Sequence, residues 1–482
     1  MQKKSIIVSA LSAMTLAGVI LASSCKKDNN VNNHAAVAGA LVLSVCDSTT
    51  TKATDSTITG NITADLHLGN TKRYILGAQV WVTGNHTLTI DAGAVIAGKV
   101  GDTTIGGVPG GALIITKGSK LVAVGTPANP IVFTSANSGT ATAPRSGDWG
   151  GIILLGQAPT NAPLTTVVEG VTPPAGVDGT FGGSLPHDNS GILKYVRIEY
   201  AGYAQVVDKE INALTLAGVG DGTTIDYVEA FKSNDDSFEW FGGTVNCSHL
   251  ISVDALDDMF DTDNGFVGSI TYALGLADQN RADKSQSNGF ESDNDATGSA
   301  STPFTHPKYK FVTIAGTTAA RAAVTNSAPS GAGSYGRAAH IRRNAEFTID
   351  SSIFLGYNEG WDMDTTLPAS GANTISKYVA GTSTTNKLFA TGYTSAGGVQ
   401  YGYTKEFSGV FSLYTMKAGD NDVTVSGPTT ILPLFTTHTN ISNFIPTSAT
   451  YRVAGAFPNG TNWTKNNAPA CTSDHPAWVR LQ

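Results

Sequence analysis

The sequence predicts an all-β fold in which the chain winds as a solenoid of short parallel strands, with each turn of the chain forming one repeat. Two observations predict it. From Thr57 onward, short runs of β-forming residues alternate with glycine, asparagine and aspartate, and almost no stretch has a helical period. In the middle of the chain, residues 234–245 align with residues 256–267 at an offset of 22 residues. A period in the twenties with this composition is typical of a solenoid.

The first residues predict export. Lys3 and Lys4 precede an uncharged, largely apolar run from Ser5 to Ser24, as in a secretory signal peptide spanning residues 1–24. The small residues before Cys25 suit a lipoprotein signal peptidase, so we expect this cysteine to carry the lipid. An ordinary cleaved signal followed by an incidental cysteine is the alternative.

The remainder of the chain divides into three predicted parts. Residues 25–57 begin with a polar stretch without periodicity, so we expect a lipidated N-terminus and a flexible tether. Residues 58–465 are predicted to form the β-helix domain, and residues 466–482 a C-terminal tail. Loop insertions rich in glycine, proline, alanine, serine and threonine are expected at 101–110, 135–147, 157–189, 277–288 and 318–337.

The composition disfavours several kinds of partner and site. The net charge is −8 with only 14% charged residues, so no basic stripe is available to neutralise nucleic-acid phosphates. After the signal, no stretch approaches the roughly 18–20 apolar residues of a membrane span, so we expect lipid alone to hold the body at a membrane. The cysteines Cys46, Cys247 and Cys471 lack the spacing of a zinc site, and a disulfide between the first and the last stays open.

The repeat predicts which side chains stack on one another. Parallel strands from successive turns pair at about 4.8 Å, so the same position of each turn forms a column, and inward columns must be apolar. Looser copies of the repeat occur at residues 289–295 and 360–364, with residues 340–344 between them. The predicted inward column consists of Phe238, Phe260, Phe290, Ile341 and Trp361. The adjacent column, predicted to face outward, consists of Glu239, Asp261, Glu291, Arg342 and Asp362.

Acidic residues are concentrated in this repeat. Between Glu229 and Asp295 there are 14 acidic and 3 basic residues, a local balance of −11. Stacked carboxylates must share protons, bind a cation or lean apart, and Ca²⁺ takes roughly six to eight such oxygen ligands. The predicted Ca²⁺ face consists of Asp261, Asp263, Glu291 and Asp293, with Asp362 and Asp364 as weaker candidates. The alternative is a solvated acidic face that Arg342 or Arg343 neutralises.

Four separated segments resemble a family of right-handed parallel β-helix lipoproteins common in Bacteroidota, whose members are mostly uncharacterised. The segments are residues 88–96, 148–156, 210–220 and 238–245. The similarity runs from about Ile58 to Trp463. It implies that the single-stranded parallel β-helix is right-handed and that the protein is placed at the cell surface.

Catalysis is the competing interpretation of this fold. Parallel β-helices include polysaccharide lyases, which use Ca²⁺ and a basic residue, and glycosidases, which use a carboxylate pair. Asp235 and Asp236 follow Asn234 in a run that resembles the paired aspartates of pectin-cleaving hydrolases, and Arg342 or Arg343 could act as a lyase base. The downstream Gly-His-Gly motif of those hydrolases is absent from the sequence, and fold analogy alone is a weak argument for activity.

We therefore expect a monomeric lipoprotein anchored to the outer membrane and displayed at the cell surface. Its expected role is to bind a glycan or another surface ligand without catalysis, with Ca²⁺ as the candidate cofactor. A lyase or glycoside hydrolase acting on acidic polysaccharide is the alternative, and a purely structural spacer is the third. Aromatic residues that could stack on sugars if they face outward, although such residues more often fill the core, are Trp81, Trp149, Trp240, Trp361, Tyr200, Tyr203 and Tyr357.

Overall fold

The computed structural model describes residues 52, 54–102, 110–203, 210–278, 281–316, 325–326, 333–357, 362–363, 377–378, 388–393, 399–401, 440–445, 454–465 and 476–481. The chain divides into two units, residues 1–36 and 37–482, and all the described residues belong to the second. The predicted signal peptide and most of the tether lie outside the described residues, as do Cys25, Cys46, Cys471, Trp361, Asp364 and the side chain of Asp362. Among the described residues, no helix has the length and apolar character needed to cross a membrane.

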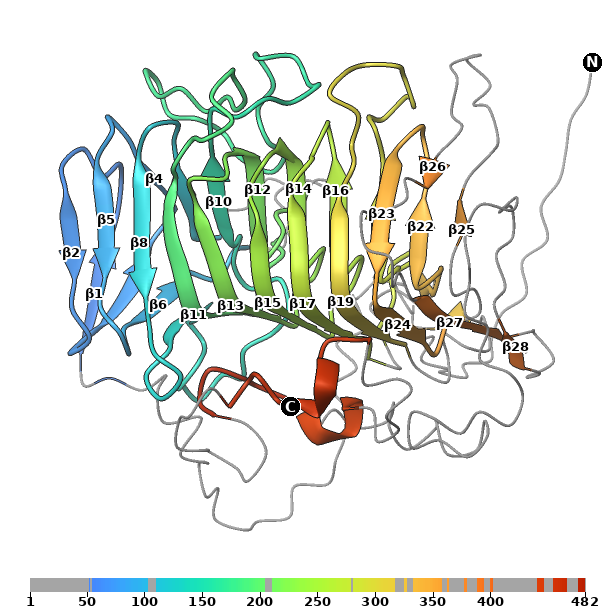
Figure 1. The fold of residues 1–482 in the computed structure, drawn as a ribbon. Coiled ribbons are helices and arrows are strands. Elements are labelled where there is room, and N and C mark those ends of the chain that lie inside the picture. Colours follow the sequence, from blue (N-terminus) through green and yellow to red (C-terminus); the bar gives the residue numbers. More distant parts are fainter. Residues whose placement is uncertain are drawn as a thin grey trace, which may run out of the picture. The chain divides into compact units, whose positions relative to one another are not determined.

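The described residues form a parallel β-helix, as the repeat predicts (Figure 1). Each coil contributes one strand to a nine-stranded sheet, which we call sheet I. Its strands follow the chain in order and are all parallel. They are β4 (Gln79–Val82), β7 (Ala112–Ile115), β10 (Ile152–Leu155), β12 (Leu214–Val219), β14 (Phe238–Gly243), β16 (Phe260–Asp263), β18 (Phe290–Ser292), β22 (Ala339–Ile341) and β25 (Asp362–Met363).

The second sheet, sheet II, consists of two columns of parallel strands that meet at a bend. One column contains β2 (Leu66–Leu68), β5 (Thr87–Ile90), β8 (Lys120–Val124), β23 (Glu346–Asp350) and β26 (Lys377–Tyr378). The other column contains β1 (Asp55–Ile58), β3 (Arg73–Leu76), β6 (Val95–Gly98), β9 (Ile131–Ser135), β24 (Ser352–Leu355) and β27 (Leu388–Tyr393). Five longer strands span both columns: β11 (Gly191–Glu199), β13 (Thr224–Phe231), β15 (Cys247–Val253), β17 (Ser269–Leu276) and β19 (Lys308–Ala315).

A few described elements lie outside these two parallel arrangements. Strand β28 (Val399–Tyr401) pairs antiparallel with β27, and β20 (Thr325–Asn326) pairs antiparallel with β21 (Gly333–Ser334). Two short 3₁₀ helices, η2 (Ile441–Phe444) and η3 (Pro458–Gly460), belong to the C-terminal part of the chain.

The repeat in the sequence is one coil of the β-helix. Phe238 pairs in register with Phe260, and Phe260 with Phe290. Their ring centroids are 5.6 and 5.4 Å apart, and all three side chains are fully buried. An offset of one coil therefore places identical aromatic side chains on top of one another inside the solenoid, where they form the centre of the apolar core.

The predicted register of the next coil is wrong by two residues. Ala339, not Ile341, follows Phe290 in the inward column, and His340, not Arg342, follows Glu291 in the outward column. A long insertion separates β18 from β22, so a fixed offset no longer locates the pairing. A shift of two residues preserves the alternation of the strand, and Ile341 therefore still lies fully buried in the core.

The five long strands of sheet II each bend at one residue, a feature that the period alone does not predict. The bending residue has a left-handed backbone with φ between 51° and 60°, which is uncommon for residues other than glycine. The bending residues are Tyr195, Tyr227, His249, Tyr272 and Phe311. Their rings stack one above the next with centroid separations between 4.2 and 5.2 Å. We call this row the aromatic ladder.

The C-terminal segments dock on the outside of sheet II. The ring of Trp463 lies 4.9 Å from that of His249, and the ring of Trp478 lies 5.5 Å from that of Tyr227. Both tryptophans belong to a second apolar cluster that also contains Val253 and other outward side chains of sheet II. Residues 476–481, in the predicted tail, are thus packed against the β-helix.

A buried charge network fastens this docked segment. Arg197 and Glu199 form an ion pair that is almost fully buried, and the Nη1 atom of Arg480 lies 2.8 Å from Glu199 Oε2. The Nη1 group of Arg197 donates to the carbonyl of Ala477 at 2.7 Å, and the backbone N–H of Arg480 donates to Glu229 at 2.8 Å. Burial works to raise the pKa of Glu199, but the two arginine charges lower it to about 2.

Replacing Arg480 with methionine should lower the free energy of unfolding by about 2–3 kcal/mol, because the buried Glu199 loses one of its two cations. Urea denaturation followed by circular dichroism measures this loss. Glu229→Gln is the matched control. Burial raises the pKa of Glu229 to about 8, so this carboxyl is mainly protonated at pH 7, and a glutamine oxygen can still accept the Arg480 N–H. Equal losses of unfolding free energy in Arg480→Met and Glu229→Gln would contradict the role of the Arg480 charge in the network.

Candidate functional site

The outer face of sheet I changes from apolar to acidic along the solenoid. One row of paired outward residues begins with Trp81, Ile114 and Ile153, which are fully buried. Val168 and Phe181, from the insertion that follows β10, pack over this part of the row. After Thr215 the same row continues with Glu239, Asp261 and Glu291.

Nine carboxylates lie on or beside the second half of this row. They are Asp235, Asp236, Glu239, Asp257, Asp258, Asp261, Asp263, Glu291 and Asp293. We call them the acidic face. It contains the four residues predicted as a Ca²⁺ face, with Asp261 paired in register with Glu291. Glu239 was predicted in the same outward column as Asp261 and Glu291, and the register confirms this placement.

The turns before the strands are held by side chains that bond the backbone of the next coil. Asp236 Oδ1 accepts the N–H of Asp258 at 2.8 Å, and Asp258 Oδ1 accepts the N–H of Asn288 at 2.5 Å. Asn288 Oδ1 in turn accepts the N–H of Arg337 at 2.8 Å. Since Asn288 performs this role with an amide, the negative charges of the two aspartates are not needed to form the turns.

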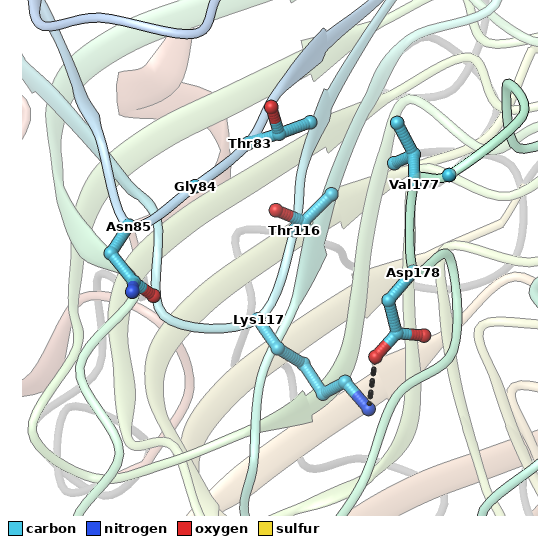
Figure 2. Close-up of a pocket in the computed structure, with 8 residues that line it drawn as sticks. Thr83, Gly84, Asn85, Thr116, Lys117, Val177 and Asp178 are labelled. Carbon is cyan, nitrogen blue, oxygen red and sulfur yellow. Dashed lines mark ion pairs between the residues drawn. The ribbon is translucent and has the colours of Figure 1, made fainter.

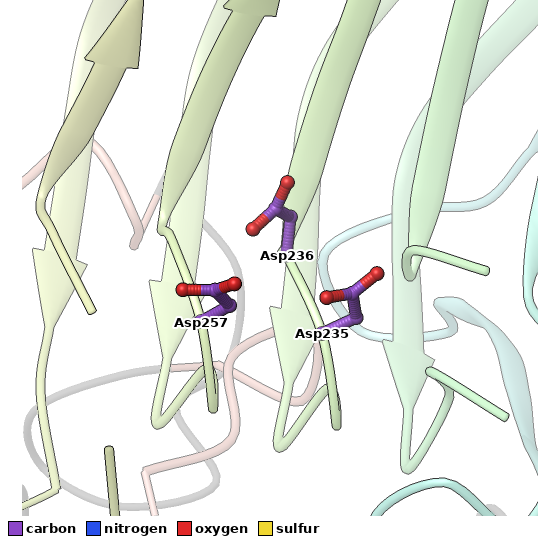
Figure 3. Close-up of side chains that lie close together, drawn as sticks. All are labelled: Asp235, Asp236 and Asp257. Carbon is purple, nitrogen blue, oxygen red and sulfur yellow. The ribbon is translucent and has the colours of Figure 1, made fainter. Parts of the chain in front are cut away.

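The carboxylates form three overlapping groups, in each of which one oxygen per residue lies within 4.8 Å of the others. The groups are Asp235, Asp236 and Asp257; Asp236, Glu239 and Asp261; and Asp258, Asp261 and Glu291. Figure 3 shows the first, in which Asp235 and Asp236 lie on one coil and Asp257 on the next. Asp236 and Asp261 each belong to two groups, so the groups run continuously along the sheet.

Negative charge on this face is poorly compensated. Within the described part of the chain, no lysine or arginine forms an ion pair with any of its carboxylates except Glu291 and Asp293. Burial and the neighbouring carboxylates raise the pKa values of Asp236, Glu239, Asp258 and Asp261 well above their ordinary range. The same two causes raise the pKa values of Asp257 and Asp263 to about 8. The groups therefore either hold protons or require a cation.

Arginine side chains neutralise one end of the acidic face. The guanidinium of Arg342 bonds Glu291 and, through Nε, lies 2.9 Å from Asp293 Oδ1, while Arg343 Nη1 lies 2.6 Å from Asp293 Oδ2. Burial works to raise the pKa of Glu291, but His340, whose Nδ1 lies 3.7 Å from Glu291 Oε2, and the Arg342 charge lower it below its ordinary value. Arg342 thus reaches the acidic column from the neighbouring outward position rather than standing in it.

Two buried oxygens of the site lack a hydrogen-bond partner among the described residues. One is Asp261 Oδ1, in the residue shared by two of the groups, and the other is Oδ1 of Asn212, whose amide N–H donates to Glu239. A buried oxygen without a donor is costly, and a divalent cation would satisfy it. Carboxylate and amide oxygens are the ligands that Ca²⁺ prefers. The residues present therefore fit Ca²⁺, which Asp236, Glu239 and Asp261 would hold as one of the carboxylate groups.

Most of the residues considered for catalysis are already engaged in hydrogen bonds or ion pairs. Asp236 accepts a backbone N–H and is 7% exposed, and Asp235 belongs to the first carboxylate group. Arg342 is ion-paired twice; burial works to lower its pKa, but Glu291 and Asp293 raise it above its ordinary value, so this residue holds its proton firmly. A lyase base must be deprotonated so that it can accept a proton, and the ion-paired Arg342 is not.

The aromatic residues considered for sugar stacking do not form an exposed platform. Those in the described part of the chain are buried: Trp81, Trp149, Trp240, Tyr200, Tyr203 and Tyr357. Trp81 is buried on the outer face of sheet I, whereas Trp240 lies in the core against Phe238.

The family model of the pectate-lyase-like β-helix domain matches residues 60–420. The chain belongs to this family. The pectate-lyase-like β-helix fold accounts for the parallel sheets and for their order, and the right-handed parallel β-helix predicted from the sequence is confirmed. No curated protein and no solved structure matches the chain. Membership in the pectate-lyase-like β-helix family shows the fold, but it does not by itself show what the chain binds or does.

The acidic face predicts how the stability of the metal-free protein depends on pH. Carboxylates whose pKa is raised from 3.8 to about 8, as in Asp257 and Asp263, bind more protons folded than unfolded between these values. Their contribution is complete below about pH 4 and is lost as the pH rises toward 8. Glu229 acts in the same direction. In the presence of a chelator, the melting temperature should therefore fall by at least about 3 °C between pH 5.5 and pH 8.

Differential scanning calorimetry measures this dependence. The double variant Asp257→Asn, Asp263→Asn removes two of the responsible groups and leaves Glu229 in place, so its melting temperature should fall by less. An unchanged or rising melting temperature in the wild-type protein over this pH range would show that the carboxylates are charged and compensated in the folded state.

Proposed function

We propose that this chain is an exported lipoprotein that binds Ca²⁺ on its acidic face and, through the ion, holds an acidic polysaccharide without cleaving it. The observation that carries the proposal is the set of three overlapping carboxylate groups, which have no cation partner among the described residues apart from Arg342 and His340 at one end. Protons satisfy such groups at low pH, and a divalent cation is the alternative at neutral pH.

Partial exposure of the site supports a role in binding. Asp236 and Glu239 are 7% and 9% exposed, whereas Asp235, Asp257 and Asp261 remain partly accessible. With one oxygen from each, the three carboxylates of the Asp236, Glu239 and Asp261 group supply fewer than the roughly six to eight oxygens that Ca²⁺ takes. A bound ion would therefore keep positions for oxygens from solvent or from a ligand, and the carboxylate of a uronic acid is such a ligand. Without the ion, the face would repel a polyanion.

The engagement of the basic residues favours binding over cleavage. Arg342 holds its proton in ion pairs with Glu291 and Asp293, so it is not available as a proton acceptor in the metal-free site. We therefore prefer a non-catalytic role to that of a lyase or glycoside hydrolase.

The proposed location follows from the sequence. The basic and apolar start of the chain and Cys25 support export and lipid attachment at that cysteine. The resemblance of four segments to β-helix lipoproteins of Bacteroidota supports an outer-membrane anchor with the β-helix displayed at the cell surface. In this setting a monomer with a polyanion-binding face would retain a polysaccharide at the cell.

A retention experiment tests the function. The purified mature chain is run through gels containing polygalacturonate, alginate or neutral xylan, with Ca²⁺ or with a chelator, and the same mixtures are assayed for unsaturated products and new reducing ends. Retention by an acidic polysaccharide in Ca²⁺ only, without products, is expected. Product formation would establish the enzyme alternative, and retention that a chelator does not alter would remove the metal from the mechanism.

A further inference from the structure

A concave site lies away from the acidic face, where two turns of the solenoid meet the insertion that follows β10. The pocket has a volume of about 360 Å³, and its lining includes Thr83, Asn85, Lys117, Val177 and Asp178. Figure 2 shows it, with the turn after β4 on one side and Val177 and Asp178 on the other. It lies beyond the ends of β4 and β7, and the acidic face begins three strands later in sheet I, at β14.

A charged pair is fixed in the wall of the pocket. Lys117 Nζ lies 2.9 Å from Asp178 Oδ2 and donates to Thr180 Oγ1 at 2.7 Å. Asp178 Oδ1 accepts both the N–H and the hydroxyl of Thr180, at 2.9 and 2.7 Å. An ammonium has three donors and a carboxylate about four acceptor positions, so each group keeps capacity for one further hydrogen bond. The pair is neutral as a whole and held in place from both sides.

The opposite wall adds polar groups on a tight turn. Gly84 and Asn85 have left-handed backbones, with φ of 71° and 63°, which turn the chain sharply after β4. A Cβ atom on Gly118 of the next coil would lie 2.1 Å from Asn85 Oδ1. A residue other than glycine at position 118 would therefore displace the Asn85 side chain. Neither Thr83 nor Asn85 makes a side-chain hydrogen bond within the described residues.

The third wall is apolar and open. Val177 contributes an aliphatic side chain, and a Cβ atom on Gly176 would meet nothing within 4 Å. The pocket therefore combines one apolar contact, a fixed donor, a fixed acceptor, an amide and hydroxyl groups. Its volume is near the lower end of the roughly 300–1,000 Å³ typical of ligand pockets.

We propose that this pocket binds one neutral sugar unit of a glycan, with Lys117 and Asp178 bonding adjacent hydroxyl groups and Asn85 a third. Each sugar hydroxyl both donates and accepts, and so matches an ammonium and a carboxylate placed side by side. An anion would meet the Asp178 charge, and a metal ion would find a single carboxylate already paired with Lys117. This inference extends the proposed glycan binding to a second subsite that does not depend on Ca²⁺.

Ligand-observed NMR on the full mature chain tests the pocket. The probes are xylo-, cello-, manno- and malto-oligosaccharides, with an oligogalacturonate as the charged comparison, each measured in Ca²⁺ and in chelator. At least one neutral oligosaccharide should bind, equally in both conditions. Asp178→Asn and Asn85→Ala should each weaken this binding by about tenfold or more. Asp221→Asn, an aspartate paired with His187 at the surface outside the pocket, should leave it unchanged.

Two variants keep the test decisive. Asp178 also holds the insertion through Lys117, so its variant could act by loosening the loop, whereas Asn85 has no such contact in the described residues. Failure of all neutral probes to bind, or binding that survives both variants, would overturn the pocket. Its failure is separable from that of the proposed function, because Ca²⁺-dependent retention of an acidic polysaccharide should persist in Asp178→Asn.

Discussion

Replacing Phe260 with alanine should lower the free energy of unfolding by about 3–5 kcal/mol, the range for removing a buried aromatic ring. Phe260 lies between Phe238 and Phe290, with centroid separations of 5.6 and 5.4 Å, and is fully buried. The variant would leave a cavity between two coils and remove both ring contacts. In a solenoid each coil contacts only its neighbours, so the loss cannot be spread over the whole core. Urea denaturation followed by circular dichroism measures it.

Phe260→Leu is the control for this variant. Leucine keeps the position apolar and fills much of the space, so we expect a loss of less than about 1.5 kcal/mol. If alanine cost no more than leucine, the phenylalanine column would not be the centre of the core, and the alignment of the coils would have to be revised.

Asp261→Asn should abolish the stabilisation of the protein by Ca²⁺. At a hundredfold excess over its dissociation constant, one ion stabilises the folded state by about 2.7 kcal/mol, which corresponds to roughly 3 °C in the melting temperature of a body of this size. Asp261 belongs to two carboxylate groups, and its Oδ1 atom is buried without a partner among the described residues. Calorimetric melting in Ca²⁺ and in chelator measures the gain for each protein.

The direction in which the melting temperature changes without Ca²⁺ distinguishes the loss of a Ca²⁺ site from damage to the fold. In the metal-free protein at pH 7.5 the Asp261 carboxyl either repels its neighbours or must take up a proton, and asparagine does neither, so metal-free Asp261→Asn should melt at the same or a higher temperature than the metal-free wild type. Asp65→Asn is the matched control, because its side chain is 77% exposed and an amide oxygen can still accept the N–H of Thr87. Loss of the Ca²⁺ response in both variants would contradict a local site.

The sequence predicts the fold well wherever one coil follows the next without interruption. Phe238 and Phe260, and Glu239 and Asp261, are 22 residues apart and are neighbours in space, because the backbone returns to the same position after one coil. After β18 a long insertion intervenes, and the number of residues per coil no longer fixes the register. The predicted place of Arg342 was therefore wrong, although its guanidinium still reaches Glu291.

The burial of the acidic face depends on contacts that have no sequence period. Asn161, from the insertion after β10, donates to the carbonyl and the side chain of Asn294 at 2.8 and 3.1 Å and thereby brings that insertion beside the acidic strands. The docking of Trp463 and Trp478 on sheet II is equally remote in sequence. Such contacts join segments more than a hundred residues apart, and no local pattern encodes them.

One missed feature did have a signal. Each long strand of sheet II contains an aromatic residue or histidine directly followed by an apolar residue, as in Tyr195-Val196, Tyr227-Val228 and His249-Leu250. Aligning these pairs by coil would have predicted the aromatic ladder, because equivalent positions of parallel coils stack. The uncompensated charge of the acidic face, by contrast, could not be predicted from the sequence, because the sequence does not show which cations lie near it.

Anomalous diffraction tests the cation site most directly. Crystals of the chain soaked in Sr²⁺, a heavier ion that also prefers oxygen ligands, should show an anomalous peak bounded by Asp236, Glu239 and Asp261, and crystals of Asp261→Asn should not. A wild-type crystal without density at this position, or with an equal peak in the variant, would contradict metal binding by the acidic face.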